Sequence, residues 1–150
     1  MPRSTVARID LDALRRNFQT AQRRAGGARV MAVVKADGYG HGIGHVASAL
    51  DSLAPKYAVA CIEEARAIRD TGLVQPVVLL QGVHAEADIA ECARSGFEPV
   101  FHSFQQLAWL ERLDTWPAFW LKVNSGMNRL GFHPDELAGV MSRLQAMSAD

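Results

Sequence analysis

The chain has 150 residues, of which 49% are hydrophobic and 21% charged, with 16 basic and 16 acidic side chains that cancel to a formal net charge of zero. This composition is typical of a globular protein, and the balanced charge lacks the basic face that nucleic acid binding requires, so we expect no nucleic acid partner. No stretch approaches the ~18 apolar residues of a membrane span and the N-terminus lacks the apolar segment of a secretory signal, so we expect a cytoplasmic protein with no membrane partner.

The first part of the chain predicts a strand, a helix and a second strand. Residues 5–9 alternate between polar and apolar side chains, which predicts a short half-buried strand. Asp10 then supplies a carboxylate suited to capping a helix over residues 11–25, which a pair of glycines ends. A continuous apolar run over residues 30–34 predicts a strand buried on both faces. Three glycines in seven residues follow at 36–42, and this segment is predicted to be a loop.

Helices and strands alternate over the remainder of the chain. The predicted strands are 57–61, 77–80, 99–101 and 119–123, and the predicted helices are 43–53, 63–70, 86–94, 104–113 and 135–149. Strands that alternate with helices and are apolar throughout indicate an α/β fold with a parallel sheet. Five buried strands fit either part of an eight-stranded barrel, which takes ~250 residues, or a complete doubly wound sheet, so periodicity leaves both open.

Lys35 stands at the end of the buried strand over residues 30–34, where a lysine does little for packing. Its ammonium is costly to remove from water, so a lysine at such a place usually has a chemical use. An unprotonated amine attacks a carbonyl to form a Schiff base, and we interpret Lys35 as a candidate for that chemistry. The alternative is a lysine that merely turns outward where the strand ends.

The sequence around Lys35 is Ala-Val-Val-Lys-Ala-Asp-Gly-Tyr-Gly-His-Gly, over positions 32–42. This string resembles the cofactor-lysine signature of the alanine racemase family, whose barrel domain binds pyridoxal 5'-phosphate (PLP). The resemblance implies that Lys35 bonds the cofactor and acts as one catalytic base. It also implies that Tyr39 contacts the cofactor phosphate, which suits a phenol donor on a tight loop.

A second string, Trp-Leu-Lys-Val-Asn-Ser-Gly-Met-Asn-Arg-Leu-Gly-Phe, occupies positions 120–132 and resembles another segment of the same family. The resemblance implies that Arg129 binds both the phenolic oxygen of the cofactor and the carboxylate of the substrate. It further implies that Lys122, a position often carbamylated in the family, holds Arg129 in place. A carbamate turns an ammonium into an anion, which pairs with a guanidinium where an ammonium would repel it.

The family resemblance also implies a fold and a domain organisation. It favours part of a (β/α)8 TIM-type barrel, with about five of the eight βα units preceded by one N-terminal strand. Residues 1–10 would then form a strand that pairs with a C-terminal β-domain, and residues 11–150 an incomplete PLP-binding barrel domain. The second catalytic base, a tyrosine from the other subunit of a homodimer, would lie outside this sequence. We therefore expect an N-terminal fragment that is inactive alone.

The predicted function is the interconversion of L-alanine and D-alanine, either to supply D-alanine for peptidoglycan or in alanine catabolism. A broad-specificity amino-acid racemase of the same fold, a non-catalytic PLP-binding barrel protein and a remnant without function remain open. A decarboxylase of the related fold fits the glycine-rich loop less well. His41 and His45 are four residues apart, but the glycines around them make a regular helical face doubtful, so we expect no metal site.

Overall fold

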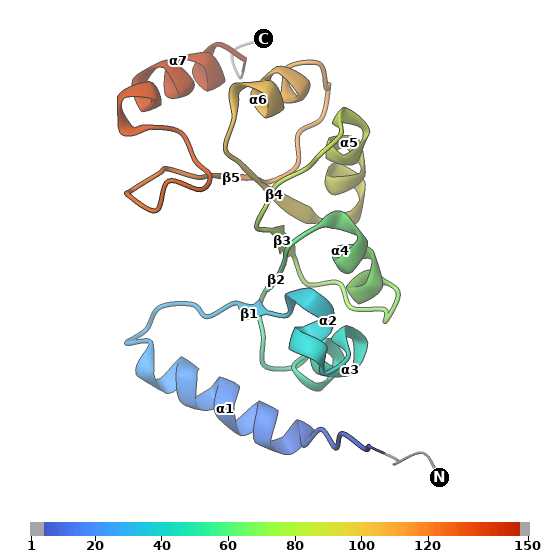
Figure 1. The fold of residues 1–150 in the computed structure, drawn as a ribbon. Helices are drawn as coiled ribbons and strands as arrows, with labels where there is room; N and C mark the ends of the chain where they lie inside the picture. The colour runs from blue at the N-terminus through green and yellow to red at the C-terminus, as the bar shows by residue number, and fades with distance from the viewer. Residues whose placement is uncertain (1–4, 148–150) are drawn as a thin grey trace.

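A computed structural model describes residues 5–147, which include a five-stranded parallel sheet (Figure 1). The strands are β1 (Ala32–Val33), β2 (Tyr57–Val59), β3 (Val77–Leu79), β4 (Phe97–Phe101) and β5 (Trp120–Leu121). They lie side by side in chain order, and each pairs in parallel with the next. A doubly wound sheet reverses its strand order at a switch point, so the order observed here selects part of a barrel.

Helices connect consecutive strands, and further helices precede the first strand and follow the last. They are α1 (Leu11–Arg24), α2 (Lys35–Gly40), α3 (Ile43–Ala49), α4 (Ile62–Arg69), α5 (Glu86–Ser95), α6 (Phe104–Leu110), the 3-10 turn η1 (Pro134–Glu136) and α7 (Leu137–Met147). In Figure 1 the strands follow the middle of an arc, with α3, α4 and α5 on its outer side and α1 and α7 towards its two ends. Within residues 5–147, no helix has both the length and the apolar character needed to cross a membrane.

The strands bury apolar side chains on both faces of the sheet. Outward side chains pack beneath the helices in the main core, and they include Tyr57, Val59, Val77, Leu79, Phe97 and Phe101. Inward side chains form a separate small cluster of Ala58, Val78 and Val100, with Met31 and Leu80 against it. Because successive strand residues point to opposite faces, two apolar faces require an unbroken apolar run in the sequence.

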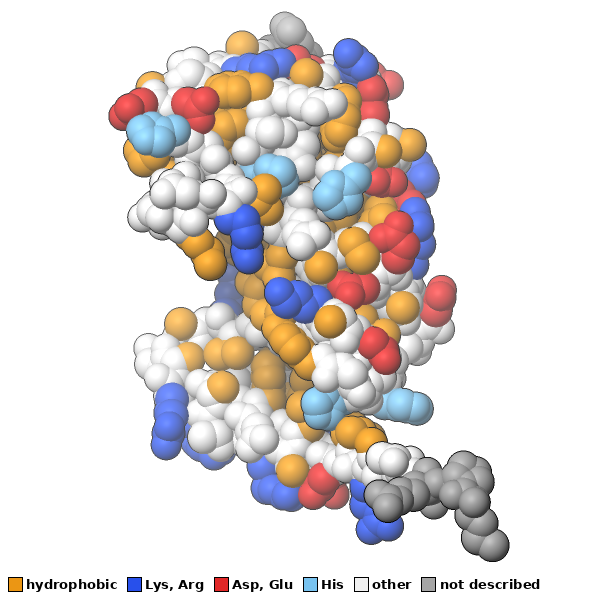
Figure 2. Space-filling model, viewed as in Figure 1, with side chains coloured by type: hydrophobic (Ala, Val, Ile, Leu, Met, Phe, Trp, Pro, Cys, Tyr) orange, Lys and Arg blue, Asp and Glu red, His pale blue; other side chains and the backbone are white. Residues whose placement is uncertain are grey.

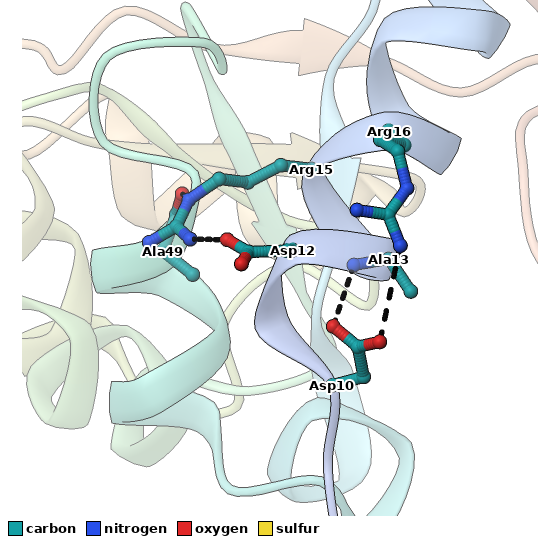
Figure 3. Close-up of polar contacts among 6 residues, drawn as sticks. All are labelled: Asp10, Asp12, Ala13, Arg15, Arg16 and Ala49. Carbon is teal, nitrogen blue, oxygen red and sulfur yellow. Dashed lines mark hydrogen bonds and ion pairs between the residues drawn. The ribbon is translucent and has the colours of Figure 1, made fainter.

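Helix α1 begins at its predicted N-cap, Asp10, which confirms that prediction (Figure 3). The Asp10 carboxylate accepts a hydrogen bond from the backbone N of Ala13 at 2.8 Å, and this bond lowers the pKa of the Asp10 carboxyl below its usual value. Arg15 donates to the Asp12 carboxylate at 2.6 Å and to the backbone carbonyl of Ala49 at 2.9 Å. The Ala49 contact ties α1 to the end of α3.

The structure corrects two sequence predictions. Residues 5–10 form no strand: they are exposed, and no described residue pairs with them, whereas an extended segment becomes a strand only by bonding to a neighbour. Their pairing with a further domain stays a prediction. The segment 36–42, predicted as a loop, contains instead most of α2, a turn whose backbone at residues 36–39 is left-handed. Predictions for residues 1–4 and 148–150, including the end of the last helix, lie outside the described residues.

The Arg69 side chain joins the segments that lead into β3 and β4. Its guanidinium donates to the backbone carbonyl of Ser95 from two nitrogens, at 3.1 and 2.8 Å. It also donates to the carbonyls of Leu73 and Gln75, the latter at 3.1 Å. The guanidinium carbon lies 5.3 Å from the ring centroid of Phe97. One side chain therefore satisfies three backbone carbonyls at the N-terminal end of the sheet.

We expect Arg69→Lys to lower the free energy of unfolding by about 1–3 kcal/mol, because lysine keeps the charge and loses the forked donation to the carbonyls. Arg66→Lys is the matched control on the same helix. Arg66 pairs with Glu91 near the surface, and pairs of this kind contribute about 0–1 kcal/mol. Urea denaturation measures both losses, and equal losses would contradict the role given to Arg69.

Candidate functional site

The C-terminal ends of the strands surround a cleft of about 430 Å³. The residues that line it are Lys35, Ala60, Leu80, Gln81, His84, His102, Lys122, Arg129 and Leu130. Six of these nine residues come within two residues of the end of a strand, which is where a parallel barrel gathers its reactive groups. Figure 2 shows the molecule hollowed on this side, with hydrophobic and basic side chains along the hollow. The cleft brings together three of the four site residues predicted from the sequence.

Lys35 is half-buried at the point where β1 passes into α2. The next four residues, Ala36–Tyr39, have left-handed backbone, with φ between 52° and 62°. The Asp37 carboxylate accepts from the backbone N of Ile43 at 2.7 Å and so fixes the turn to the start of α3. Left-handed backbone is strained for residues other than glycine and persists only where surrounding contacts enforce it. The contacts of the turn therefore fix the backbone from which the Lys35 side chain extends.

Lys122 enters the same cleft from the end of β5. It is half-buried, and its Nζ donates to the backbone carbonyl of Leu80 at 2.9 Å. Burial lowers the pKa of the Lys122 ammonium below its usual value, and the nearby Arg129 guanidinium lowers this pKa further. A lower pKa increases the fraction of neutral, nucleophilic amine at a given pH. Lys122 and Arg129 are thus close enough for their positive charges to repel each other, and the role of Lys122 in holding Arg129 stays a prediction.

The loop that carries Arg129 is tied back onto the end of β5. The backbone N of Asn124 donates to the carbonyl of Phe132 at 2.8 Å, and the backbone N of Phe132 donates to the carbonyl of Lys122 at 2.9 Å. Within the loop, the Asn124 side chain accepts from the backbone N of Asn128 at 3.0 Å and donates to its side-chain oxygen at 2.9 Å. These bonds fix the residue that precedes Arg129.

Tyr39 does not line this cleft. Its side chain is 58% exposed and lines a second hollow beside Arg8, Ile9 and Asp10. The left-handed turn carries Tyr39 away from Lys35 and towards the segment that precedes α1. The contact predicted between its phenol and the cofactor phosphate stays a prediction.

Sequence reasoning missed three polar side chains of the cleft: Gln81, His84 and His102. His102 Nε2 lies 3.1 Å from the backbone carbonyl of Gln81, and its backbone N donates to the buried Gln106 side chain at 2.9 Å. Gln81 and His102 each come shortly after a strand. Their position after a predicted strand could have identified them as cleft residues, since the C-terminal ends of parallel strands lie on one rim.

The cleft is rich in positive charge. Lys35, Lys122 and Arg129 line it, and none of its described lining residues is Asp or Glu. Such a cleft favours a ligand with negative charge, such as a phosphate ester or a carboxylate, and offers it an amine that can react with a carbonyl. Within residues 5–147, no group of three or more His, Cys, Asp or Glu side chains is arranged to hold a metal ion.

Comparisons with known sequences agree on one family. Residues 9–149 match the family model described as alanine racemase, N-terminal domain. The chain is 63% identical over 145 residues to the alanine racemase of Marinobacter nauticus, and the aligned region covers 97% of this chain and 40% of that protein. Its identity to the alanine racemase of Thioalkalivibrio sulfidiphilus is 48% over 151 residues, with 98% of this chain and 42% of that protein covered.

Solved structures give the same result. The alanine racemase of Acinetobacter baumannii matches with a TM-score of 0.86 at 35% identity, over 93% of this chain and 40% of that one. The biosynthetic alanine racemase of Pseudomonas aeruginosa matches with a TM-score of 0.84 at 38% identity, over 91% of this chain and 39% of that one. The chain thus spans about 40% of the length of the relatives it matches.

Gly131 allows the Arg129 loop to approach β5. Its φ is 120°, and an added Cβ would lie 2.7 Å from the backbone N of Asn124 and 2.9 Å from the carbonyl carbon of Val123. We expect Gly131→Ala to lower the free energy of unfolding by about 1–3 kcal/mol, because the backbone must shift to relieve both contacts. Urea denaturation measures this loss, and limited proteolysis within residues 124–131 measures the loosening of the loop.

Gly139→Ala is the control for that substitution. Gly139 lies in α7, and an added Cβ there meets nothing within 4 Å. Alanine in a helix is expected to stabilise the protein by about 0.5–1 kcal/mol relative to glycine. If Gly131→Ala kept the original stability and the loop stayed resistant to protease, the close approach would not be required.

Proposed function

We propose, because the chain belongs to the alanine racemase family, that it supplies the lysine-bearing part of the barrel of a PLP-dependent enzyme that interconverts L-alanine and D-alanine. One observation carries the proposal: Lys35, Lys122 and Arg129 line a single cleft whose described lining includes no carboxylate. An amine and a guanidinium in such a cleft are the groups that an aldehyde cofactor and an amino acid carboxylate require.

The chemistry of the cleft fits PLP. The cofactor carries a phosphate and a phenolic oxygen, and the substrate adds a carboxylate, so a cleft lined by cations suits the pair. When bound, PLP supplies an aldehyde that bonds to an amine and a conjugated ring that spreads the charge left when an α-proton departs. Lys35 would hold the aldehyde and Arg129 the phenolic oxygen. Tyr39 is assigned the phosphate by family resemblance alone, since it lines a neighbouring hollow.

Lys35 and Arg129 have different roles toward the substrate: Arg129 binds it and Lys35 transfers a proton. Arg129 pairs with the substrate carboxylate and so limits the positions that the α-carbon takes. Released from the aldehyde when the substrate amine takes its place, Lys35 Nζ would accept the α-proton on one face of the substrate and return it in the reverse direction. The base for the opposite face lies outside this sequence and is proposed to come from a second subunit.

Lys122 would orient Arg129 as a carbamate. Its lowered pKa leaves more neutral amine to react with CO2, and the reaction forms an N–C bond and releases one proton. The product is an anion that attracts Arg129, whereas the ammonium form repels it. Carbamylation of Lys122 thus changes the sign of its interaction with Arg129.

The activity, partners and location of the whole protein are part of the same proposal. We infer a cytoplasmic homodimer that acts on alanine and supplies D-alanine for peptidoglycan or takes part in alanine catabolism. The relatives that carry the name alanine racemase support this inference. The chain covers about 40% of their length, and the activity proposed is that of the whole protein.

The full-length protein that contains this chain is expected to convert L-alanine to D-alanine with added PLP. Lys35→Ala should lower the rate by a factor of about 10³ or more, because it removes both the covalent anchor and one base. Chiral chromatography measures the conversion. Borohydride reduction followed by peptide mass analysis should place the pyridoxyl adduct on Lys35, and an adduct on another lysine instead would contradict the assignment.

The same assay on the 150-residue chain alone should show no conversion. In the described chain β1 and β5 each have one unpaired edge, and the barrel they begin is not closed. Conversion of L-alanine by these 150 residues with PLP, lost in Lys35→Ala, would overturn this expectation.

Carbon-13 bicarbonate is expected to give a carbamate carbonyl signal that Lys122→Arg removes, because arginine keeps the positive charge and forms no carbamate. Since only the neutral amine reacts and the pKa of Lys122 is lowered, the signal should persist to lower pH than for a free lysine. Lys56→Arg is the control, because Lys56 is paired with Glu98. Carbon NMR measures the signal, and its persistence in Lys122→Arg would contradict the assignment.

A further inference from the structure

One carboxylate bonds the ends of two neighbouring strands. Glu64, in the first turn of α4, accepts from the backbone N of Ala36 at 2.7 Å and from the backbone N of Ala60 at 2.8 Å. Each of its two oxygens takes one of these bonds. Ala36 comes directly after Lys35, and Ala60 comes directly after β2 and lines the cleft. Glu64 therefore connects the residue that follows Lys35 to the end of the neighbouring strand β2.

This arrangement differs from the capping box of a helix N-terminus. In a capping box the third helical residue bonds the backbone N of the N-cap residue, which for α4 is Cys61. Glu64 bonds the residue before that cap and, in addition, a residue 28 positions away. Capping of α4 would require neither bond, so the contact with Ala36 has another consequence.

That consequence concerns the strained turn after Lys35. Ala36 is the first left-handed residue, with φ 52°, and alanine adopts this backbone only when other contacts enforce it. The Asp37 bond to Ile43 holds the far side of the turn, and the Glu64 bond holds its first residue. Loss of the Glu64 bond allows Ala36 to relax and changes the direction in which Lys35 leaves the strand.

We propose that Glu64 is a positioning residue for Lys35, which holds the Lys35 amine at the rim of the cleft by fixing the backbone on its C-terminal side. The proposal rests on the proposed function, in which Lys35 reacts with the aldehyde of PLP. A carboxylate is the group required, because two N–H donors converge on it and a carboxylate accepts at both oxygens. Glutamine offers one acceptor oxygen and one donor nitrogen. It therefore loses one of the two bonds and places its NH2 group against a backbone N–H that also donates.

The lysine content of the chain makes the proposal easy to test. These 150 residues hold three lysines, Lys35, Lys56 and Lys122, so the shares of reduced pyridoxyl adduct on their peptides can be compared directly. The share of adduct on Lys35 reports the direction of its amine, and general loss of stability would not redirect it to Lys122. Glu63→Gln is the matched control, since Glu63 is the neighbour of Glu64 on α4 and hydrogen-bonds the Cys61 side chain instead of a strand end.

Two measurements on the full-length protein test the role of Glu64. Without cofactor, Glu64→Gln should raise the hydrogen exchange rates of the Ala36 and Ala60 amides by about ten-fold or more, the factor expected for loss of a charge-assisted bond. With PLP and borohydride, it should lower the initial rate of adduct formation on Lys35 about ten-fold and raise the share on Lys122. Glu64→Asp should restore part of both, and Glu63→Gln should match the unsubstituted protein.

The two measurements distinguish a failure of the positioning role from a failure of the proposed function. Unchanged amide exchange in Glu64→Gln, or faster exchange with an unchanged rate and share of adduct on Lys35, would overturn the positioning role alone. Absence of any Lys35 adduct in the unsubstituted protein would overturn the proposed function. If Glu64→Gln does not fold, the milder Glu64→Asp carries the same two measurements, and a Lys35 adduct equal to that of the unsubstituted protein would again overturn the role.

Discussion

The site depends on one constraint of chain topology: parallel strands added in sequence order place all their C-terminal ends on one rim. Lys35 and Lys122 are 87 positions apart in the chain, yet each comes within two residues of a strand end and both line the same cleft. No local contact between the two segments is needed to bring them together. The sheet does this, and the side chains that follow each strand then decide what the rim can bind.

The lysines show how the two ends of the sheet differ. Lys56, just before β2, donates to both oxygens of Glu98 at 2.6 Å, and the Trp120 indole donates to the same carboxylate at 2.7 Å. At the opposite end, Lys122 donates to a neutral carbonyl. Partial burial beside the Arg129 guanidinium lowers the pKa of Lys122, so its ammonium loses its proton more readily than that of a free lysine. The same residue type therefore forms an ion pair at one end of the sheet and lines the cleft at the other.

The predicted strands overlap all five observed ones. The strands β2 and β3 are buried along their whole length, which leaves an unbroken apolar run, whereas Glu98 interrupts the run in β4 and the predicted strand there begins late. Periodicity could not choose between a barrel and a doubly wound sheet, since strand order is a property of distant segments. Its position at the end of a buried strand made Lys35 a candidate, and the family motifs added Lys122 and Arg129 as candidates and assigned a role to each. The left-handed turn was missed because Ala36 disfavours that backbone locally. The Glu64 contact was missed because it spans 28 positions and leaves no periodic signal.

The turn after Lys35 shows how local strain and distant contacts balance. Three of its four left-handed residues are not glycine, at roughly 1–2 kcal/mol each, so the turn costs roughly 3–6 kcal/mol. Two carboxylate bonds hold its ends, at Ala36 and at Ile43, and bonds to charged groups contribute about 1.5–3 kcal/mol each. The cost of the left-handed backbone and the contribution of the two carboxylate bonds are of similar size, so the turn is only marginally stable. Loss of either bond would redirect the backbone next to Lys35 while the buried core, which contains neither carboxylate, stays intact.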